Sequence, residues 1–271
     1  MIMANKVIVN YHDALIYQSD LNLLDEGQWV NDACINFGMT HLAVRHEGNC
    51  QDGGSVIRMK FLDPSVVSYF MHQLCLSDED DIDELCNLYS MWGLSAAKST
   101  PEQMTSGDYQ TLVLFIAVND NNSTGFGSGC NHWSFLLAVI VNGKHFFFHF
   151  DSSAGYNQQS AIAVSKRIRD IIMVGSNEQS IDDVDVIECR VPQQVNGYDC
   201  GLHTLVTAEV VSEAIDSLAV DEMIGNDVIP FKLSIEEKIG AFIRKFGSTC
   251  EMGKEARKRL AANIMFAASN R

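Results

Sequence analysis

Predominantly apolar runs along the chain predict the strands of a central sheet. They are residues 112–118 (LVLFIAV), 132–141 (HWSFLLAVIV) and 144–151 (KHFFFHFD), with a further strand at 184–191 that Pro192 ends. A strand that is apolar on both faces is normally covered on both faces. The pattern therefore predicts a sheet that lies between other layers of the protein.

A hairpin is predicted between the second and third of these strands. Asn142 and Gly143 separate them, and Asn-Gly between apolar runs is the strongest short signal for a two-residue turn. With this turn, Ser134 faces Asp151, and His132 becomes the diagonal neighbour of Asp151 on the same face. Side chains in such positions reach one another, so the hairpin predicts contact between a histidine and a carboxylate.

Helices are predicted where apolar residues recur at helical spacing, in residues 33–44, 65–76, 159–173 and 202–214. The chain also reads as helical after Asp216, and its final segment, 234–266, is either a packed helix or a tail that binds a partner. Strands and helices of these lengths together predict an α+β fold.

Residues 47–110 are the least informative part of the sequence. A strand or helix-flanking segment is expected near residues 56–62, and residues 77–83 (SDEDDID) carry five acids. The acidic run is interpreted as a solvated loop or a helix start, with contact to a basic partner as the alternative.

Length and composition indicate an intracellular globular protein. The 271 residues, 46% of them hydrophobic, suit one large domain or one domain with an extension. No apolar run reaches the roughly 18 residues of a membrane span, and the first residues lack the features of a signal peptide. We therefore expect no membrane contact, a location in the cytoplasm and/or nucleus, and a monomer.

The cysteines and the net charge limit which cofactors and partners the protein is expected to bind. Eight scattered cysteines without CxxC spacing predict reduced thiols, with neither a metal site nor an organic cofactor. A net charge of −16 argues against nucleic-acid binding. The charge suits a basic partner, or it serves solubility alone.

Cys200 is the candidate nucleophile. It follows the polar stretch Gln193–Asp199 and opens a predicted helix, with Asp199 as the expected N-cap. Backbone N–H groups and the helix dipole at such a position stabilise a thiolate. Gly201 would leave room for a substrate backbone, and Gln193 or Gln194 could donate to an oxyanion. The alternative is a buried cysteine at a helix start.

His132 is the candidate base, because it lies at the open end of its strand and beside Asp151. His145 and His149 fall on the same sheet face but lie among phenylalanines, nearer the turn. His203, three residues beyond Cys200, ranks second, because no carboxylate is placed to orient it. Residues 119–131, a Gly, Asn and Ser-rich loop before His132, are interpreted as a mobile binding element or as a simple surface loop.

Two residues near the start of the chain are also singled out. Trp29 precedes the predicted helix 33–44, and from local sequence alone a core position is favoured for it. Asp32 would by the same reasoning be an N-cap.

These blocks together resemble the Ulp/SENP family of cysteine proteases, which act on ubiquitin-like modifiers. The resemblance rests on QWVND near the start, the strand that ends in VND, HWSFLL, HFDS and QQVNGYDCG, in that order. The opening residues 11–32 and the tyrosine of YDCG are most similar to the deneddylase branch, which removes the Nedd modifier. The resemblance implies a papain-like fold with a central mixed sheet and the nucleophile at a helix N-terminus.

The resemblance also implies roles for single residues. His132 would be the general base, Asp151 its orienting acid, Cys200 the nucleophile, and Gln194 with the Cys200 N–H the oxyanion hole. Trp29 and Trp133 would clamp the Gly-Gly tail of the modifier, and Asp32 would contact that tail. Residues 1–220 would form the protease domain and residues 221–271 a helical extension packed on it.

The expected activity is hydrolysis of the bond after the C-terminal Gly-Gly of a modifier, with Nedd favoured. The alternatives are a SUMO- or ubiquitin-directed protease of the same family, a non-catalytic modifier-binding protein, and an acetyltransferase with a similar core.

Overall fold

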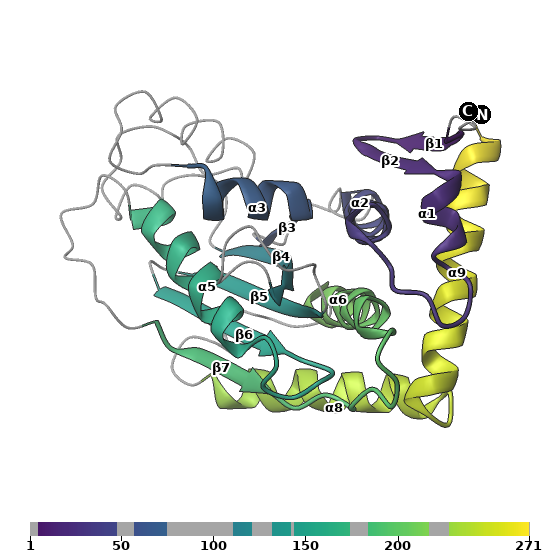
Figure 1. Cartoon of the computed structure of the whole chain (residues 1–271). Coiled ribbons are helices and arrows are strands. Elements are labelled where there is room, and N and C mark those ends of the chain that lie inside the picture. The colour runs from purple at the N-terminus through teal and green to yellow at the C-terminus, as the bar shows by residue number, and fades with distance from the viewer. Residues whose placement is uncertain are drawn as a thin grey trace.

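The computed structural model describes residues 5–47, 57–74, 111–120, 132–141, 144–173, 184–216 and 228–270. At its centre is a sheet of order β3-β4-β5-β6-β7 (Figure 1). The strands are β3 (Ile57–Phe61), β4 (Thr111–Asn119), β5 (Trp133–Val141), β6 (Lys144–Phe150) and β7 (Val186–Cys189). The two outer pairs, β3–β4 and β6–β7, are parallel, whereas β4, β5 and β6 are antiparallel. The sheet is therefore mixed, as the family resemblance implies.

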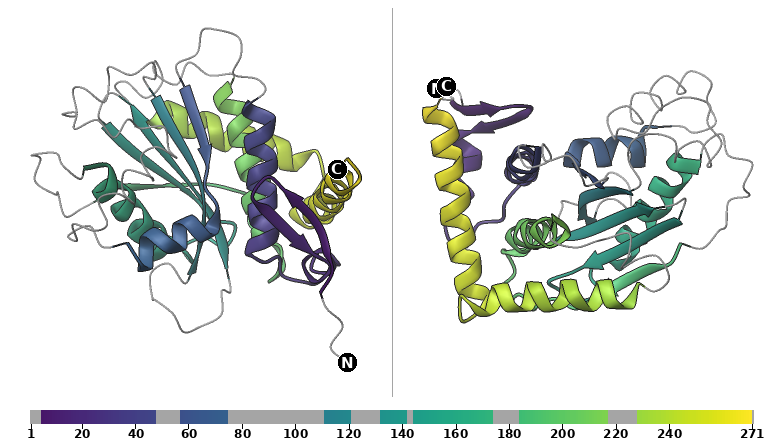
Figure 2. Two further views of the ribbon diagram at one scale, coloured as in Figure 1. Left: turned by 90° about the horizontal axis from the view of Figure 1, so that it is seen from above. Right: turned by 180° about the vertical axis from the view of Figure 1, so that it is seen from behind.

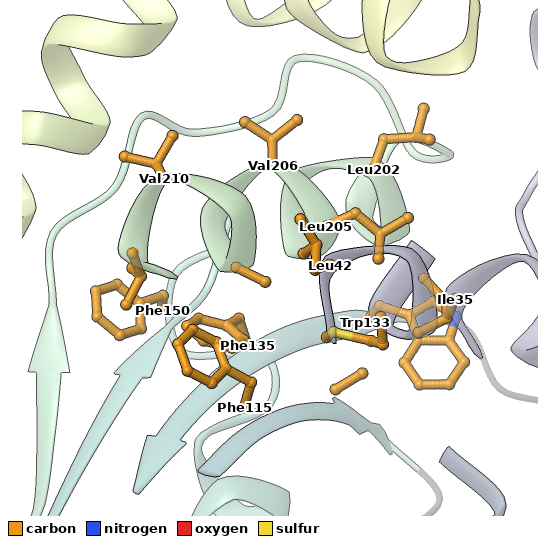
Figure 3. Packing of buried hydrophobic residues seen from close by; sticks show 14 of the residues in the cluster. Ile35, Leu42, Phe115, Trp133, Phe135, Phe150, Leu202, Leu205, Val206 and Val210 are labelled. Atoms are coloured by element: carbon orange, nitrogen blue, oxygen red, sulfur yellow. The ribbon is translucent and has the colours of Figure 1, made fainter. Parts of the chain in front are cut away.

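Helices cover both faces of this sheet, which explains why β4 and β5 are apolar throughout. On one face lie α3 (Pro64–His72) and α5 (Gln158–Met173), and on the other α2 (Asp32–Glu47), α6 (Cys200–Asp216) and α8 (Ile229–Arg244) (Figure 2). Successive β4 residues alternate between two hydrophobic clusters, with Phe115 in the larger and Leu114 in the smaller. The larger cluster packs α6 against β5 (Figure 3).

The N-terminal segment forms a hairpin that the hydrophobic pattern did not predict. Strands β1 (Val7–Tyr11) and β2 (Ala14–Tyr17) pair antiparallel, and His12 in the turn adopts a φ of 52°. Strands of four or five residues give too few alternations to stand out in the sequence. The short helix α1 (Gln18–Asn22) follows.

The C-terminal segment is two helices rather than one. Helix α8 ends at Arg244, and α9 (Thr249–Ser269) begins after Gly247, whose φ is +80°, and the N-cap Ser248. Both helices contribute to the larger cluster, for example through Phe231 and Leu260, and α9 lies against β1 (Figure 1). Of the two interpretations of this segment, the packed helix is the one observed.

Three sequence predictions fall outside the described residues: the acidic run 77–83, the loop 119–131 beyond Asp120, and the Asn-Gly turn. Within the described part of the chain, none of the helices combines the length and the apolar character that crossing a bilayer requires.

Candidate active site

The hairpin of β5 and β6 brings His132 and Asp151 together. Its register pairs Phe135 with Phe150 and Val141 with Lys144, as the two-residue turn predicted. His132 lies immediately before β5 and Asp151 immediately after β6, and His132 Nε2 is 2.6 Å from Asp151 Oδ1. Both side chains are buried. The predicted contact between histidine and carboxylate is therefore confirmed.

The loop after β6 folds back on the carboxylate of Asp151. The backbone N–H of Ser153 donates to Oδ1 at 2.9 Å, and that of Asn157 donates to Oδ2 at 3.0 Å. Burial alone would raise the pKa of Asp151, but the hydrogen bonds from His132 and from these N–H groups hold it below its usual value. The carboxylate is thus fixed and ionised.

Cys200 lies next to His132. It is the first residue of α6 and it is buried, and the interaction of its side chain with His132 is one of the causes that raise the pKa of this histidine. Because Asp151 engages Nε2, Nδ1 is the ring nitrogen that remains for the sulfur. Burial would lower the pKa of His132, but the interactions with Asp151 and Cys200 raise it to about 9. At neutral pH the histidine can therefore carry the proton that the Cys200 thiol gives up when it becomes a thiolate.

The raised pKa of His132 makes the stability of the protein depend on pH. The folded value of about 9 exceeds the ordinary 6.5, so the contribution of this proton is complete below pH 6.5 and is lost as pH rises through about 9. We expect the difference in unfolding free energy between wild type and His132→Gln to shrink over this interval in urea titrations. A difference that stays constant with pH would contradict the raised pKa.

Asn157 is a part of the site that the sequence analysis missed. Its side-chain Nδ2 donates to the carbonyl oxygens of His132 and Val118, each at 3.2 Å, and to Ser134 Oγ at 3.1 Å. Its own N–H binds Asp151, so one buried residue holds both members of the acid–base pair. An asparagine that opens a helix carries no local signal of such contacts.

The three rival histidines lie in different environments. His149 is fully buried, between Glu188 at 2.9 Å and Ser134 at 2.9 Å, and His145 pairs with Ile140 near the hairpin turn. His203 is buried without a hydrogen-bond partner for Nε2 among the described residues, and burial lowers its pKa to about 4. His132 is the histidine that combines a carboxylate with contact to the cysteine.

The two glutamines before Cys200 have different environments. Gln193 uses both amide hydrogens on main-chain oxygens, donating to Asp151 O at 3.1 Å and to Val191 O at 2.9 Å. Gln194 donates to Asn196 O at 2.7 Å, and its carbonyl oxygen accepts from Ser152 Oγ at 2.8 Å. Among the described contacts, one amide hydrogen of Gln194 is uncommitted, which favours it over Gln193 as a donor to substrate.

Of the two predicted N-caps, Asp32 is wrong, and Asp199 holds that position through its carbonyl oxygen, which accepts from the N–H of His203 at 3.0 Å. The bond that caps α2 comes from Asn31, whose Oδ1 accepts from the N–H of Cys34 at 3.1 Å, while Asp32 is an exposed first-turn residue. Asp199 stands at the N-cap position of α6, but its carboxylate turns away to Arg257 and Asn196.

The two tryptophans differ in exposure, and the core fills the space beside Gly201. Trp29 is 49% exposed, whereas Trp133 is buried with Ile35 in the core (Figure 3). A Cβ on Gly201 would lie 2.3 Å from Val30 Cγ2 and 3.4 Å from Trp133 Cδ1. The core therefore fills the space at Gly201. The expectation that this glycine leaves room for a substrate backbone is wrong. The clamp between two tryptophans stays a prediction.

Fold and site together define a cysteine peptidase with a papain-like arrangement, in which a helix carries the cysteine and a sheet carries the histidine. Residues 28–241 match the Ulp1 protease family, C-terminal catalytic domain. The chain therefore belongs to the Ulp1 protease family.

Several relatives and solved structures are similar to the chain. It is 29% identical over 219 residues to the probable sentrin-specific protease 8 of Dictyostelium discoideum, covering 79% of this chain and 78% of that protein. It is 29% identical over 211 residues to NEDD8-specific protease 1 of Arabidopsis thaliana, covering 78% and 77%. A de-sumoylating protease superposes with a TM-score of 0.59 at 15% identity, over 100% of this chain and 93% of that one. The yeast Ulp1 protease domain, solved with SMT3, gives 0.55 at 17%, over 97% and 89%.

Proposed function

We propose that this protein is a thiol protease that hydrolyses the bond after the C-terminal Gly-Gly of a ubiquitin-like modifier, with Nedd as the modifier. The observation that carries the proposal is the buried His132–Asp151 contact of 2.6 Å, with Cys200 near enough to that histidine to help raise its pKa. A histidine oriented by an acid and in contact with a cysteine at a helix N-terminus is the arrangement that generates a nucleophilic thiolate.

In the proposed mechanism His132 takes the proton of Cys200, and the sulfur attacks the carbonyl carbon of the last glycine. The oxyanion accepts hydrogen bonds from Gln194 Nε2 and from the N–H of Cys200, which as the first residue of a helix has no partner within that helix. His132 returns the proton to the leaving amine, and the carbon–nitrogen bond breaks. Water then hydrolyses the thioester and restores the thiol.

Exposed groups in residues 29–32 and beside His132 support the recognition of an extended tail. Trp29 presents half of its surface to solvent, Asp32 is exposed at the start of α2, and the ring of Tyr156 lies 4.8 Å from that of His132 and is 57% exposed. Glycines have no side chain to clash with such rings, so a narrow passage beside Trp29 would select Gly-Gly. Trp133 would form the opposite wall of this passage.

The choice of Nedd is supported by the relatives, which are described as sentrin-specific protease 8 and as NEDD8-specific proteases. The SUMO-directed structures are 15–17% identical and support the shared fold alone. The test is to offer fluorogenic Nedd, SUMO and ubiquitin substrates side by side. No cleavage of any of them would refute the protease proposal, and a preference for SUMO would refute the choice of Nedd.

We expect Nedd to be cleaved at least about a hundredfold faster than ubiquitin, as kcat/KM, which corresponds to roughly 2.7 kcal/mol in the transition state. Before Gly-Gly, Nedd carries an alanine where ubiquitin carries an arginine, and a narrow site rejects the larger charged side chain. Changing that arginine of ubiquitin to alanine should recover part of the rate. The exposed carboxylate of Asp32 would favour an arginine and so acts against this preference. Equal kcat/KM values for Nedd and ubiquitin would contradict the choice of Nedd and leave the broader protease proposal standing.

A further inference from the structure

The C-terminal helix α9 supplies a buried cation to the segment that carries Cys200. Arg257 is 4% exposed, and Asp199, the residue before Cys200, is 2% exposed. Arg257 Nε lies 3.1 Å and Nη2 2.7 Å from Asp199 Oδ1. Because the two residues are 58 positions apart in the chain, this contact joins the end of the protein to its candidate nucleophile.

The same guanidinium also holds the segment that leads to Trp29. Nη1 donates to the carbonyl oxygens of Leu23 at 3.0 Å and Asp25 at 3.1 Å, and Nη2 donates to that of Gln28 at 2.6 Å. Nη2 also lies 3.3 Å from the carbonyl oxygen of Tyr198. One planar cation is therefore bonded to the residue before Trp29 and to the residue before Cys200.

The surroundings of Asp199 Oδ2 indicate that α9 is shaped to accept the carboxylate of Asp199. Asp199 Oδ2 accepts from Asn196 Nδ2 at 2.8 Å, and Asn196 O in turn accepts from Gln194. A Cβ on Gly253, one turn before Arg257, would lie 2.4 Å from the same Oδ2. Glycine at 253 thus lets the carboxylate approach α9, which is an observation independent of the arginine.

A contribution to folding stability alone is a weak explanation for the buried pair of Arg257 and Asp199. A buried ion pair loses solvation that its attraction only partly returns, and well-packed apolar residues often serve stability equally well. An arginine has five donors in a fixed plane, so it can bind several loop carbonyls at set angles, which a lysine cannot do. The acceptors here are main-chain oxygens of the two segments that flank the proposed substrate passage.

We propose that Arg257 is a positioning residue for the active site, which sets the relative placement of Trp29 and Cys200 through Asp199 and the carbonyls of residues 23–28. The inference rests on the proposed function, because it concerns the passage through which the Gly-Gly tail would reach the thiol. It makes α9 a part of the catalytic unit. The acid–base pair itself is built on β5, β6 and the loop after β6, and in the described part of the chain the hydrogen bonds of Arg257 go to other segments.

The test compares Arg257→Met with Arg259→Met, a matched variant on the same helix. Arg259 pairs with Glu209 at 2.8 Å and is bonded to neither of the two segments. Three measurements are made below the unfolding temperature of each variant: kcat and KM for the Nedd substrate, the rate of Cys200 alkylation by iodoacetamide, and circular dichroism. The alkylation rate measures the reactivity of the Cys200 thiol toward a small reagent that does not need the substrate passage. It therefore distinguishes a misplaced passage from a loss of folded protein.

We expect Arg257→Met to lose about a hundredfold in kcat/KM, the scale on which a misplacement of 1 Å acts, while alkylation changes much less. Arg257→Lys should stay impaired, because it restores the charge without the planar donors. Folded Arg257→Met with the kcat/KM of Arg259→Met would overturn the proposal, and so would parallel losses in turnover and alkylation.

Gly253→Ala keeps Arg257 in place and is the second test variant if Arg257→Met does not fold. Its methyl group displaces Asp199, so kcat/KM should fall while alkylation persists, and a folded variant with wild-type kcat/KM would overturn the proposal. The turnover of the wild-type protein in the same assay distinguishes failure of the proposed function from failure of the positioning role. An inactive wild type contradicts the proposed function, whereas an active wild type with an unaffected Arg257→Met contradicts only the positioning role.

Discussion

Cys200→Ala is expected to abolish hydrolysis while the protein still binds the modifier. Loss of the nucleophile in a triad protease costs on the order of 10⁶-fold in kcat, and no other described cysteine contacts His132. Affinity should persist, because Trp29, Asp32 and the surface around Tyr156 are unchanged. The measurements are turnover of a fluorogenic Nedd substrate and the dissociation constant of uncleaved Nedd.

The matched control is Cys250→Ser, which changes a half-exposed thiol on α9. Burial raises the pKa of the Cys34 thiol to about 12 and also raises the pKa of the Cys189 thiol, so both should resist alkylation at neutral pH. Iodoacetamide should therefore label Cys200 in preference to these two. Wild-type turnover by the alanine variant would exclude Cys200 as the nucleophile.

Asp151→Asn should fold and yet turn over on the order of 10⁴-fold more slowly, the loss seen when the orienting acid of a triad is neutralised. The carboxylate accepts three hydrogen bonds, from His132 and from the N–H groups of Ser153 and Asn157. Oδ1 accepts from both His132 and Ser153, and Oδ2 accepts from Asn157, so the NH₂ group of an asparagine must face either the N–H of Asn157 or the imidazole and the N–H of Ser153. In either arrangement the histidine loses the negative charge that stabilises its protonated form, and in the second it also loses the bond that orients it.

Asp170→Asn is the control for this variant, because Asp170 is partly exposed on α5 and pairs with Arg169. Kinetics and thermal unfolding of both variants are needed, since a carboxylate with three partners also contributes to folding. A folded Asp151→Asn with turnover close to that of Asp170→Asn would remove Asp151 from the mechanism. If His203→Ala were as damaging as His132→Ala, the identity of the base would change.

Much of the site could be predicted because local rules determine it. The alternation of residues along β5 and β6 and the two-residue turn fixed which side chains share a face, and so brought His132 to Asp151. Helical spacing after Cys200 placed that cysteine at a helix start. Both are periodic properties of short segments, which a sequence displays directly.

The sequence by itself thus determined strands β4 to β7, the main helices, the register of the β5–β6 hairpin and the placement of His132, Asp151 and Cys200. Tertiary structure alone decided that Asp199 binds Arg257, that Asn157 holds both His132 and Asp151, and that Gly201 packs against Val30. Arg257 reaches carbonyls that lie 229 to 234 positions away along the chain. Such contacts have no period and no local signal, because they exist only once the sheet and helices have packed and left buried polar groups in need of partners.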